Sequence, residues 1–359
     1  MRKEERNLFK MLCGFKEDTF DEGLLAYATP AVLGHLFFNR MQGVAYYTLK
    51  RHGALGKINR EFRNSLRTAY EANAAKNRSF YTCIQMLERA LEKADCPYAM
   101  LKGAYLCALY PEGCRTSNDI DLLVLPEDVT KISEALLAAG FLQGNVKNDA
   151  FIPASRQEII SSRMLRGELV PFIKEVDLPG MKFLEIDVNF SLDYKNSPKD
   201  ALADMLSHTE SKKVGEVAVR TLSDADFFIH LCSHLYKEAT TLPWVRMHRD
   251  MTLYKYADIY ALLDAMDEDA VEKIFLRARA LGLDKECAFA VLETAALFDV
   301  KSGYAVMIAE DVLRDAPDFL HTVVSPAEGK RFVFWEKDIL RRFFSDDRAE
   351  LLREVTEDV

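Results

Sequence analysis

Two aspartates, Asp119 and Asp121, stand at the start of an apolar run, residues 122–125. Side chains two residues apart on a strand project from the same face, so both carboxylates point the same way. An unpaired carboxylate is costly to bury, so such a pair either faces solvent or serves a site. Neighbouring carboxylates repel each other, and Mg²⁺ relieves that repulsion because it prefers hard oxygen ligands. Alone, the D-x-D pattern is a weak signal for a nucleotide–metal site, since surface strand ends often carry acids.

A third carboxylate, Asp187, lies in an alternating segment, residues 182–192, that predicts another strand. Ile186 and Val188 flank Asp187, so its side chain projects away from the core, and Glu185 shares its face. If the two strands are neighbours, three carboxylates converge on one spot.

The turn before the two aspartates carries features that suit a phosphate. Gly103 follows a short apolar strand, residues 98–101, and would let the backbone approach a phosphate closely. The predicted helix after it would direct its free N–H groups at the same anion. Lys102 and Arg115 supply positive charge nearby.

Hydrophobic spacing predicts the elements that must position these residues. Residues 1–96 repeat apolar residues every three or four positions, which indicates a helical region that ends where Pro97 stops its last helix. Residues 97–222 mix short strands with an amphipathic helix closed by Gly140, and the segment 216–222 is expected to be the last strand.

The last part of the chain, residues 223–359, returns to helical spacing after a capping-type start at Ser223. Its charged segments 246–250 and 336–355 are interpreted as a solvated loop and an exposed helix face. The predicted fold class is therefore α+β, a mixed sheet with helices flanked by N-terminal and C-terminal helical regions.

Composition excludes several classes of protein. With 47 Lys and Arg against 56 Asp and Glu, the net charge of −9 disfavours binding to bulk DNA or to an anionic membrane through the overall field. The seven cysteines form no C-x-x-C pair, which argues against a disulfide framework or a zinc ribbon. The first residues lack the apolar stretch of a secretory signal, and no segment has about 18 continuous apolar residues. A cytoplasmic location is expected.

The order of strand, turn, helix, D-x-D strand and later acidic strand resembles the nucleotidyltransferase superfamily of the polymerase-β type. More narrowly, Leu101-Lys102-Gly103, Arg115 and the run of residues 118–124 resemble the motifs of a largely uncharacterised bacterial nucleotidyltransferase family, in which an "LKG" turn precedes an arginine and a "DIDLLV" strand. The resemblance covers residues 98–189. It departs from many superfamily members at Ala104, where a serine usually touches the triphosphate, and at Asn118, where serine is common.

The resemblance implies two-metal nucleotidyl transfer from a nucleoside triphosphate (NTP) with release of pyrophosphate. Asp119 and Asp121 would hold the Mg²⁺ or Mn²⁺ bound to the triphosphate, and Asp187 would join them around a second metal at the acceptor hydroxyl. Asp187 would also accept the proton of that hydroxyl. Lys102, Gly103 and Arg115 would bind the nucleotide, which the resemblance places in a nucleotidyltransferase-like α/β catalytic domain, residues 97–222.

Other functions stay open. A regulatory module with the same fold would bind an NTP and transfer nothing. A metal-dependent glycosyltransferase also uses D-x-D, but it normally has a large α/β half before the motif, where this chain is helical. For a transferase, a small molecule or a protein is favoured over RNA as the acceptor because of the acidic net charge, and no membrane partner is expected.

His230 and His234 lie four residues apart, a spacing that can bind zinc on a helix. The residues between them are Leu-Cys-Ser, so the glutamate of H-E-x-x-H is missing. A polar flank on a packed helix is the favoured interpretation. The functional alternative is that His234 or Lys237 touches substrate.

Overall fold

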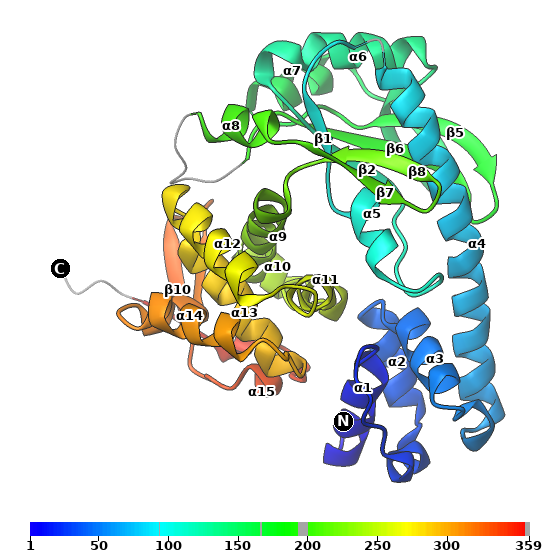
Figure 1. Ribbon diagram of the computed structural model, residues 1–359, viewed down its shortest axis with the longest axis vertical. Coiled ribbons are helices and arrows are strands. Elements are labelled where there is room, and N and C mark those ends of the chain that lie inside the picture. Colours follow the sequence, from blue (N-terminus) through cyan, green and yellow to red (C-terminus); the bar gives the residue numbers. More distant parts are fainter. Residues whose placement is uncertain (93, 166, 193–199, 356–359) are drawn as a thin grey trace. The chain divides into compact units, whose positions relative to one another are not determined.

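The computed structural model describes residues 1–92, 94–165, 167–192 and 200–355 of the chain (Figure 1). The chain divides into two compact units. The sheet unit is the continuous segment Thr68–Phe227, and the helical unit combines Met1–Arg67 with Phe228–Val359.

A six-stranded mixed sheet forms the centre of the sheet unit, in the order β1-β2-β6-β5-β3-β4. β2 and β6 run parallel, and the other four neighbouring pairs run antiparallel. The strands are β1 (Tyr98–Met100), β2 (Asp119–Val124), β3 (Leu142–Lys147), β4 (Ala150–Pro153), β5 (Phe172–Leu178) and β6 (Met181–Asn189), and a separate hairpin pairs β7 (Glu210–Val214) with β8 (Val217–Thr221). The α+β class is thus confirmed, while β3, β4 and β5 lie where the sequence pattern gave no assignment.

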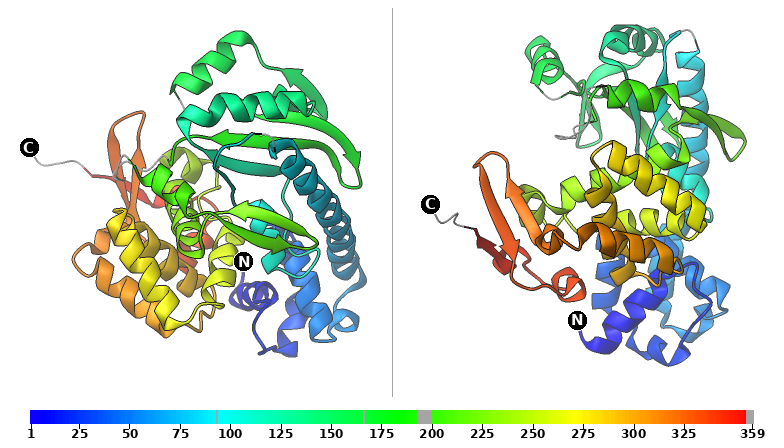
Figure 2. Two further views of the ribbon diagram at one scale, coloured as in Figure 1. Left: turned by 45° about the horizontal axis from the view of Figure 1, so that its top comes forward. Right: turned by 60° about the vertical axis from the view of Figure 1, so that its left-hand side comes forward.

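The sheet unit also contains α-helices. They are α4 (Arg60–Leu91), which starts within the helical unit, α5 (Gly103–Leu106), α6 (Val129–Ala138), α7 (Arg156–Leu165) and α8 (Ala201–Ser207). Figure 1 shows α4 running along one side of the sheet unit, and Figure 2 gives two further views. The shared core takes apolar side chains from α4, α6, β2 and β6: Phe80, Ile84, Leu87, Ile132, Leu136, Ile120, Leu122, Leu184, Ile186 and Val188. Because side chains alternate along a strand, the acids of β2 and β6 project from the opposite face.

Two turns follow the chemistry of their residues. Gly140 adopts φ +84° after α6, and the Phe141 N–H donates to the Leu136 carbonyl at 3.0 Å, which closes the helix as predicted. The β3–β4 hairpin turns at Asn148 and Asp149, both with positive φ, a conformation that these two residue types tolerate.

The helical unit is built from segments at the two ends of the chain. Phe9 on the first helix packs on Phe343 and Phe344, with ring centroids 5.9 and 5.7 Å apart. Its helices are α1 (Lys3–Cys13), α2 (Pro30–Phe38), α3 (Gln42–Arg51), α9 (Asp224–Ala239), which starts within the sheet unit, α10 (Leu242–Arg246), α11 (Leu253–Leu263), α12 (Glu268–Ala280), α13 (Asp284–Leu297), α14 (Gly303–Leu313) and α15 (Ile339–Phe343).

The structure corrects two expectations for this unit. Strands continue beyond residue 222, because β9 (Thr322–Ser325), β10 (Lys330–Phe334) and β11 (Leu352–Glu354) form an antiparallel sheet. The two charged segments are not simply solvated, because Asp250, Arg342 and Arg348 are buried. Arg348 bonds Asp250 through both Nε and Nη2, and Arg342 Nη2 lies 2.7 Å from Glu293 Oε1. Charge alone therefore misidentified structural ion pairs as surface.

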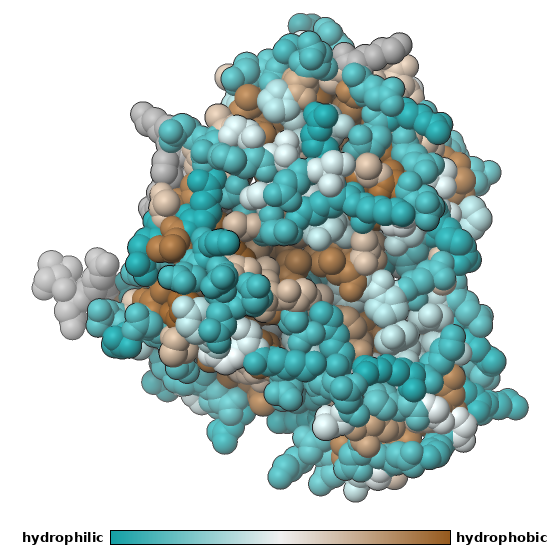
Figure 3. All heavy atoms as spheres, in the orientation of Figure 1, coloured by the Kyte–Doolittle hydropathy of each residue, from teal (hydrophilic) through white to brown (hydrophobic). Residues whose placement is uncertain are grey.

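Hydrophilic residues cover most of the face of the molecule in Figure 3. Among the described helices, none combines the length and the apolar character that a membrane span requires.

Candidate nucleotide and metal site

The parallel pairing of β2 with β6 brings the predicted acids together. Asp121 is the register partner of Asp187, and Asp119 is the partner of Glu185. Neighbouring strands lie about 4.8 Å apart, so the four carboxylates occupy one small area on the face opposite the core. We call Asp119, Asp121, Glu185 and Asp187 the acidic cluster. The expectation that the two acidic strands are neighbours is confirmed.

Charge and burial make full ionisation of the acidic cluster unfavourable. Burial raises the pKa of Asp187 from 3.8 to about 8, and Asp121, Glu185 and Asp119 add to this effect while Lys102 opposes it. Burial also raises the pKa of Glu185, followed by repulsion from Asp119 and Asp121. The acidic cluster is therefore short of positive charge.

Lys102 supplies one positive charge to the acidic cluster. Its Nζ lies 2.9 Å from Asp121 Oδ1, and the two side chains are 24% and 12% exposed. The backbone of Lys102 has φ +43° and ψ −114°, a conformation that non-glycine residues rarely adopt. The sequence predicted a phosphate ligand at this position, and in this conformation the ammonium group lies on a carboxylate.

Gly103 is required by the close approach of Ser117. A Cβ atom on Gly103 would lie 2.4 Å from Ser117 Oγ and 2.6 Å from Ser117 Cβ. Ser117 Oγ in turn donates to Asp119 Oδ1 at 2.7 Å. The sequence predicted that Gly103 makes room for a phosphate, and the role of Ser117 was not predicted. A small polar residue two positions before the D-x-D pair was the available signal.

The loop that carries Arg115 is fixed by the long helix α4. Asn77 donates from Nδ2 to the Arg115 carbonyl at 2.7 Å and accepts from the Gly113 N–H at 2.9 Å. The Arg115 guanidinium donates to the Thr116 carbonyl, next to Ser117 in the chain. The helix expected to offer N–H groups to a phosphate, α5, has only four residues.

The donors of the acidic cluster suit a divalent cation. All are hard carboxylate oxygens, and a cation would offset the repulsion that adds to burial in raising the pKa of Asp187. In the described part of the chain, no group of three or more His, Cys, Asp or Glu side chains is arranged to hold a metal as it stands. Ser117 holds Asp119 and Lys102 holds Asp121, so a cation would have to compete with these partners.

The histidine pair on α9 belongs to an ion-pair group. The rings of His230 and His234 stack with centroids 6.4 Å apart. His234 Nε2 lies 3.5 Å from Glu238 Oε2, and Lys255 also pairs with Glu238. This arrangement agrees with the interpretation of a polar helix flank for His234, whereas His230 is buried.

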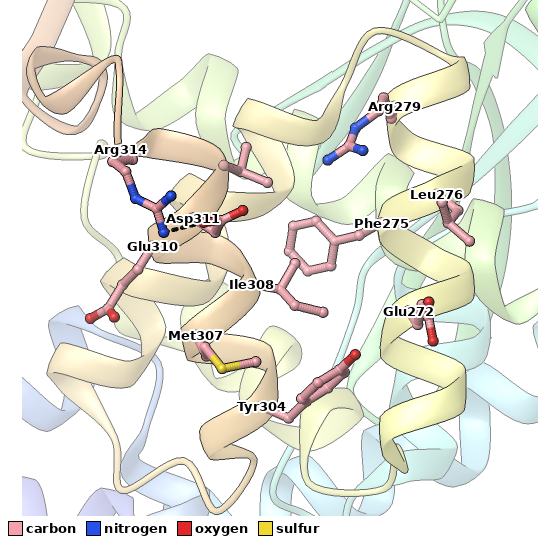
Figure 4. Close-up of a pocket in the computed structure, with 11 residues that line it drawn as sticks. Glu272, Phe275, Leu276, Arg279, Tyr304, Met307, Ile308, Glu310, Asp311 and Arg314 are labelled. Carbon is pink, nitrogen blue, oxygen red and sulfur yellow. Dashed lines mark ion pairs between the residues drawn. The ribbon is translucent and has the colours of Figure 1, made fainter.

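A surface groove of about 550 Å³ lies between α12 and α14 of the helical unit (Figure 4). Phe275 and Ile308 point into it, and Arg314 at its edge pairs with Asp311. None of the residues predicted to bind metal or nucleotide lines this groove.

Comparison with known proteins assigns the chain to a class. The profile of a family described as "Uncharacterised nucleotidyltransferase" matches residues 31–299, well over half of the chain. The chain belongs to this family, and the family supports nucleotidyl transfer as its class of activity.

We also compared the chain with curated protein sequences and with solved structures. No curated protein sequence matches the chain. An antigenic nucleotidyltransferase-like protein from Paracoccidioides brasiliensis aligns with 69% of this chain and 94% of its own, at 13% identity and a TM-score of 0.36. The antibiotic-resistance factor ANT(2'')-Ia aligns with 57% of this chain and 93% of its own, at 11% identity and a TM-score of 0.32.

Proposed function

We propose that the protein is a Mg²⁺- or Mn²⁺-dependent enzyme that transfers a nucleoside monophosphate from an NTP to a hydroxyl group of an acceptor. The observation that carries this proposal is the convergence of Asp119, Asp121 and Asp187 on one face of two parallel neighbouring strands. Membership of the nucleotidyltransferase family supports the same reaction class.

The three aspartates would hold two metal ions in this reaction. Asp119 and Asp121 would hold the metal that accompanies the triphosphate, and Asp187 would join them around a second metal. The metals, when bound, neutralise charge on the attacking and leaving oxygens. Lys102, Gly103 and Arg115 would bind the nucleotide.

The proposed transfer needs no protein nucleophile, because the acceptor hydroxyl attacks the NTP directly. The acceptor oxygen forms a bond to the α-phosphorus as the bond to the bridging oxygen breaks, and pyrophosphate leaves. Asp187 accepts the proton of the acceptor hydroxyl. Because the pKa of Asp187 is about 8 in the structure, this carboxyl must first lose its own proton, which positive charge beside it favours.

One observation favours a second candidate, a nucleotide-binding module without transfer activity. Ala104 carries no hydroxyl where many superfamily members place a serine, and its methyl group is completely buried in the core of the sheet unit. Binding of NTP with no release of pyrophosphate across pools of small-molecule, protein and RNA acceptors would favour this module. Small molecules and proteins are the favoured acceptors because the chain is acidic.

Calorimetric titration with each NTP, with and without Mg²⁺, tests the shared nucleotide site. The parent is expected to bind at least one NTP in a metal-dependent way, and Asp119→Asn/Asp121→Asn is expected to weaken that binding at least about tenfold. The matched control, Glu127→Gln/Asp149→Asn, removes two exposed acids of the sheet unit outside the acidic cluster and should bind as the parent does. Absence of NTP binding by the parent would overturn the proposal.

A further inference from the structure

Lys102 is a cation that already occupies the acidic cluster. Its Nζ lies 2.9 Å from Asp121 Oδ1, and both side chains retain some exposure, 24% and 12%. The ammonium group can therefore leave this carboxylate without unfolding of the strands. A divalent cation that binds Asp121 needs the same oxygen atoms and repels the ammonium group.

The turn holds Lys102 in place at a conformational cost. A non-glycine residue with φ +43° and ψ −114° is strained, because L-residues rarely adopt this conformation. The turn is fixed on both sides, because the Leu101 N–H donates to the Asp121 carbonyl at 2.9 Å and the Leu106 N–H donates to the Lys102 carbonyl at 2.8 Å. The tight contact between Gly103 and Ser117 restricts it further. Such backbone strain persists only where the surrounding contacts fix the conformation, as these contacts do for Lys102.

We infer that Lys102 is an exchangeable counter-ion, which neutralises Asp121 when no metal is bound and is displaced by the metal onto the phosphates of the NTP. This inference rests on the proposed function, because it requires the metal and the nucleotide to share the acidic cluster. Lys102 then has opposite effects on the binding of metal and on the binding of the NTP. Lys102 weakens the binding of metal alone and strengthens the binding of the NTP once the metal is present.

Mn²⁺ titration of the nucleotide-free protein, followed by electron paramagnetic resonance, measures the first effect. Lys102→Met is expected to bind Mn²⁺ about tenfold more tightly than the parent, which corresponds to about 1.4 kcal/mol. Lys102→Arg keeps the charge and should stay within about twofold of the parent. Lys182→Met is the matched control, since the Lys182 ammonium group on β6 donates to the Asp149 carbonyl at 2.8 Å and removing it takes away one charge outside the acidic cluster.

Calorimetric titration with NTP at saturating Mn²⁺ measures the second effect. Lys102→Met is expected to bind the NTP about tenfold more weakly, and Lys182→Met to bind it as the parent does. A lysine with a merely structural role would weaken both metal and nucleotide binding when replaced. A general effect of net charge would strengthen metal binding equally in Lys102→Met and Lys182→Met.

The outcomes separate this inference from the proposed function. Unchanged or weaker Mn²⁺ binding by Lys102→Met, with metal and NTP binding intact in the parent, would overturn the exchange and leave the nucleotidyltransferase proposal standing. No Mn²⁺ binding by any variant would overturn both.

A measurement on the parent protein avoids any dependence on the folding of the variants. Amine labelling followed by peptide mass spectrometry reports the accessibility of each lysine. Addition of Mg²⁺ is expected to accelerate labelling of Lys102 at least about threefold, because the ammonium group loses its carboxylate partner, and to leave Lys182 unchanged. An unchanged rate at Lys102 under conditions where the metal binds would contradict the inference.

Discussion

Buried carboxylates of the helical unit and those of the acidic cluster in the sheet unit differ in how many positively charged partners they have. In the helical unit, Asp250 receives three hydrogen bonds from Arg348, and Glu293 pairs with Arg342 at 2.7 Å. In the acidic cluster of the sheet unit, four carboxylates share the single ion pair from Lys102 that the described residues show. The first arrangement is electrically complete, and the second is not.

This difference separates structural acids from the acids of the proposed binding site. A buried carboxylate that only supports the fold needs a permanent partner, because unpaired charge is costly to bury. A carboxylate that binds a metal must keep its oxygens available and must carry its repulsion until the metal arrives. Burial raises the pKa of Asp187, and repulsion from the other three carboxylates of the acidic cluster raises it further.

Arg348→Met is expected to give the largest effect. It leaves Asp250, which is completely buried, without its partner, and should lower the free energy of unfolding by about 4 kcal/mol. Denaturant unfolding measures this loss. The matched control is Arg353→Met on β11, an exposed arginine whose replacement should change stability by less than about 0.5 kcal/mol. A loss below about 1 kcal/mol for Arg348→Met would show that the pair does not hold the helical unit together.

Asp187→Asn should raise the free energy of unfolding, whereas Arg348→Met lowers it. The pKa of Asp187 is about 8 in the folded protein and 3.8 in the reference state, so its contribution to stability is complete below pH 3.8 and is lost as the pH rises through 8. The amide imitates the protonated carboxyl and removes this loss. We expect Asp187→Asn to be more stable than the metal-free parent by about 2 kcal/mol at pH 9, and the gain to shrink toward pH 5.

Denaturant unfolding in the presence of a chelator at pH 5, 7 and 9 measures this trend. Asp149→Asn, at an exposed turn of the same unit, should show no such trend. A gain that does not depend on pH would mean that repulsion and burial do not act on Asp187 as described.

Gly103→Ala in the sheet unit and Gly303→Ala in the helical unit compare how tightly the surroundings of each glycine are packed. The new Cβ would meet Ser117 at 2.4 Å, so we expect a loss of about 1–2 kcal/mol in the free energy of unfolding. Gly303 at the start of α14 has nothing within 4 Å of such a Cβ, so Gly303→Ala should change stability by less than about 0.5 kcal/mol. Ser117→Gly in the Gly103→Ala background should recover most of the loss. Equal effects at the two glycines would contradict a tightly packed turn.

Local patterns were sufficient for the elements that carry the acidic cluster. The alternation around Asp187 and the apolar run after Asp121 predicted β6 and β2, because the period of a strand is visible within a few residues. Gly140 marked the end of α6 for the same reason. The pairing of the two strands required a hypothesis, since register partners far apart in sequence leave no local trace.

Partners distant in sequence explain what the sequence analysis missed. Asp250 and Arg348 are 98 residues apart, and each lies in a charged segment that is typical of a solvated surface. Their burial follows from tertiary packing alone. The ion pair between Lys102 and Asp121 was missed for a different reason: both residues were identified, but the sequence contains no information on which of two anions, carboxylate or phosphate, the ammonium group contacts.

The division of the chain into a continuous and a discontinuous unit fixes an order of assembly during synthesis. Domains generally fold as units as the chain emerges from the ribosome. All residues of the sheet unit have been made when Phe227 is added, whereas Phe9 gains its partners Phe343 and Phe344 only after those two residues have been added. The nascent chain thus completes the acidic strands while Phe9 on its first helix still lacks these two aromatic partners.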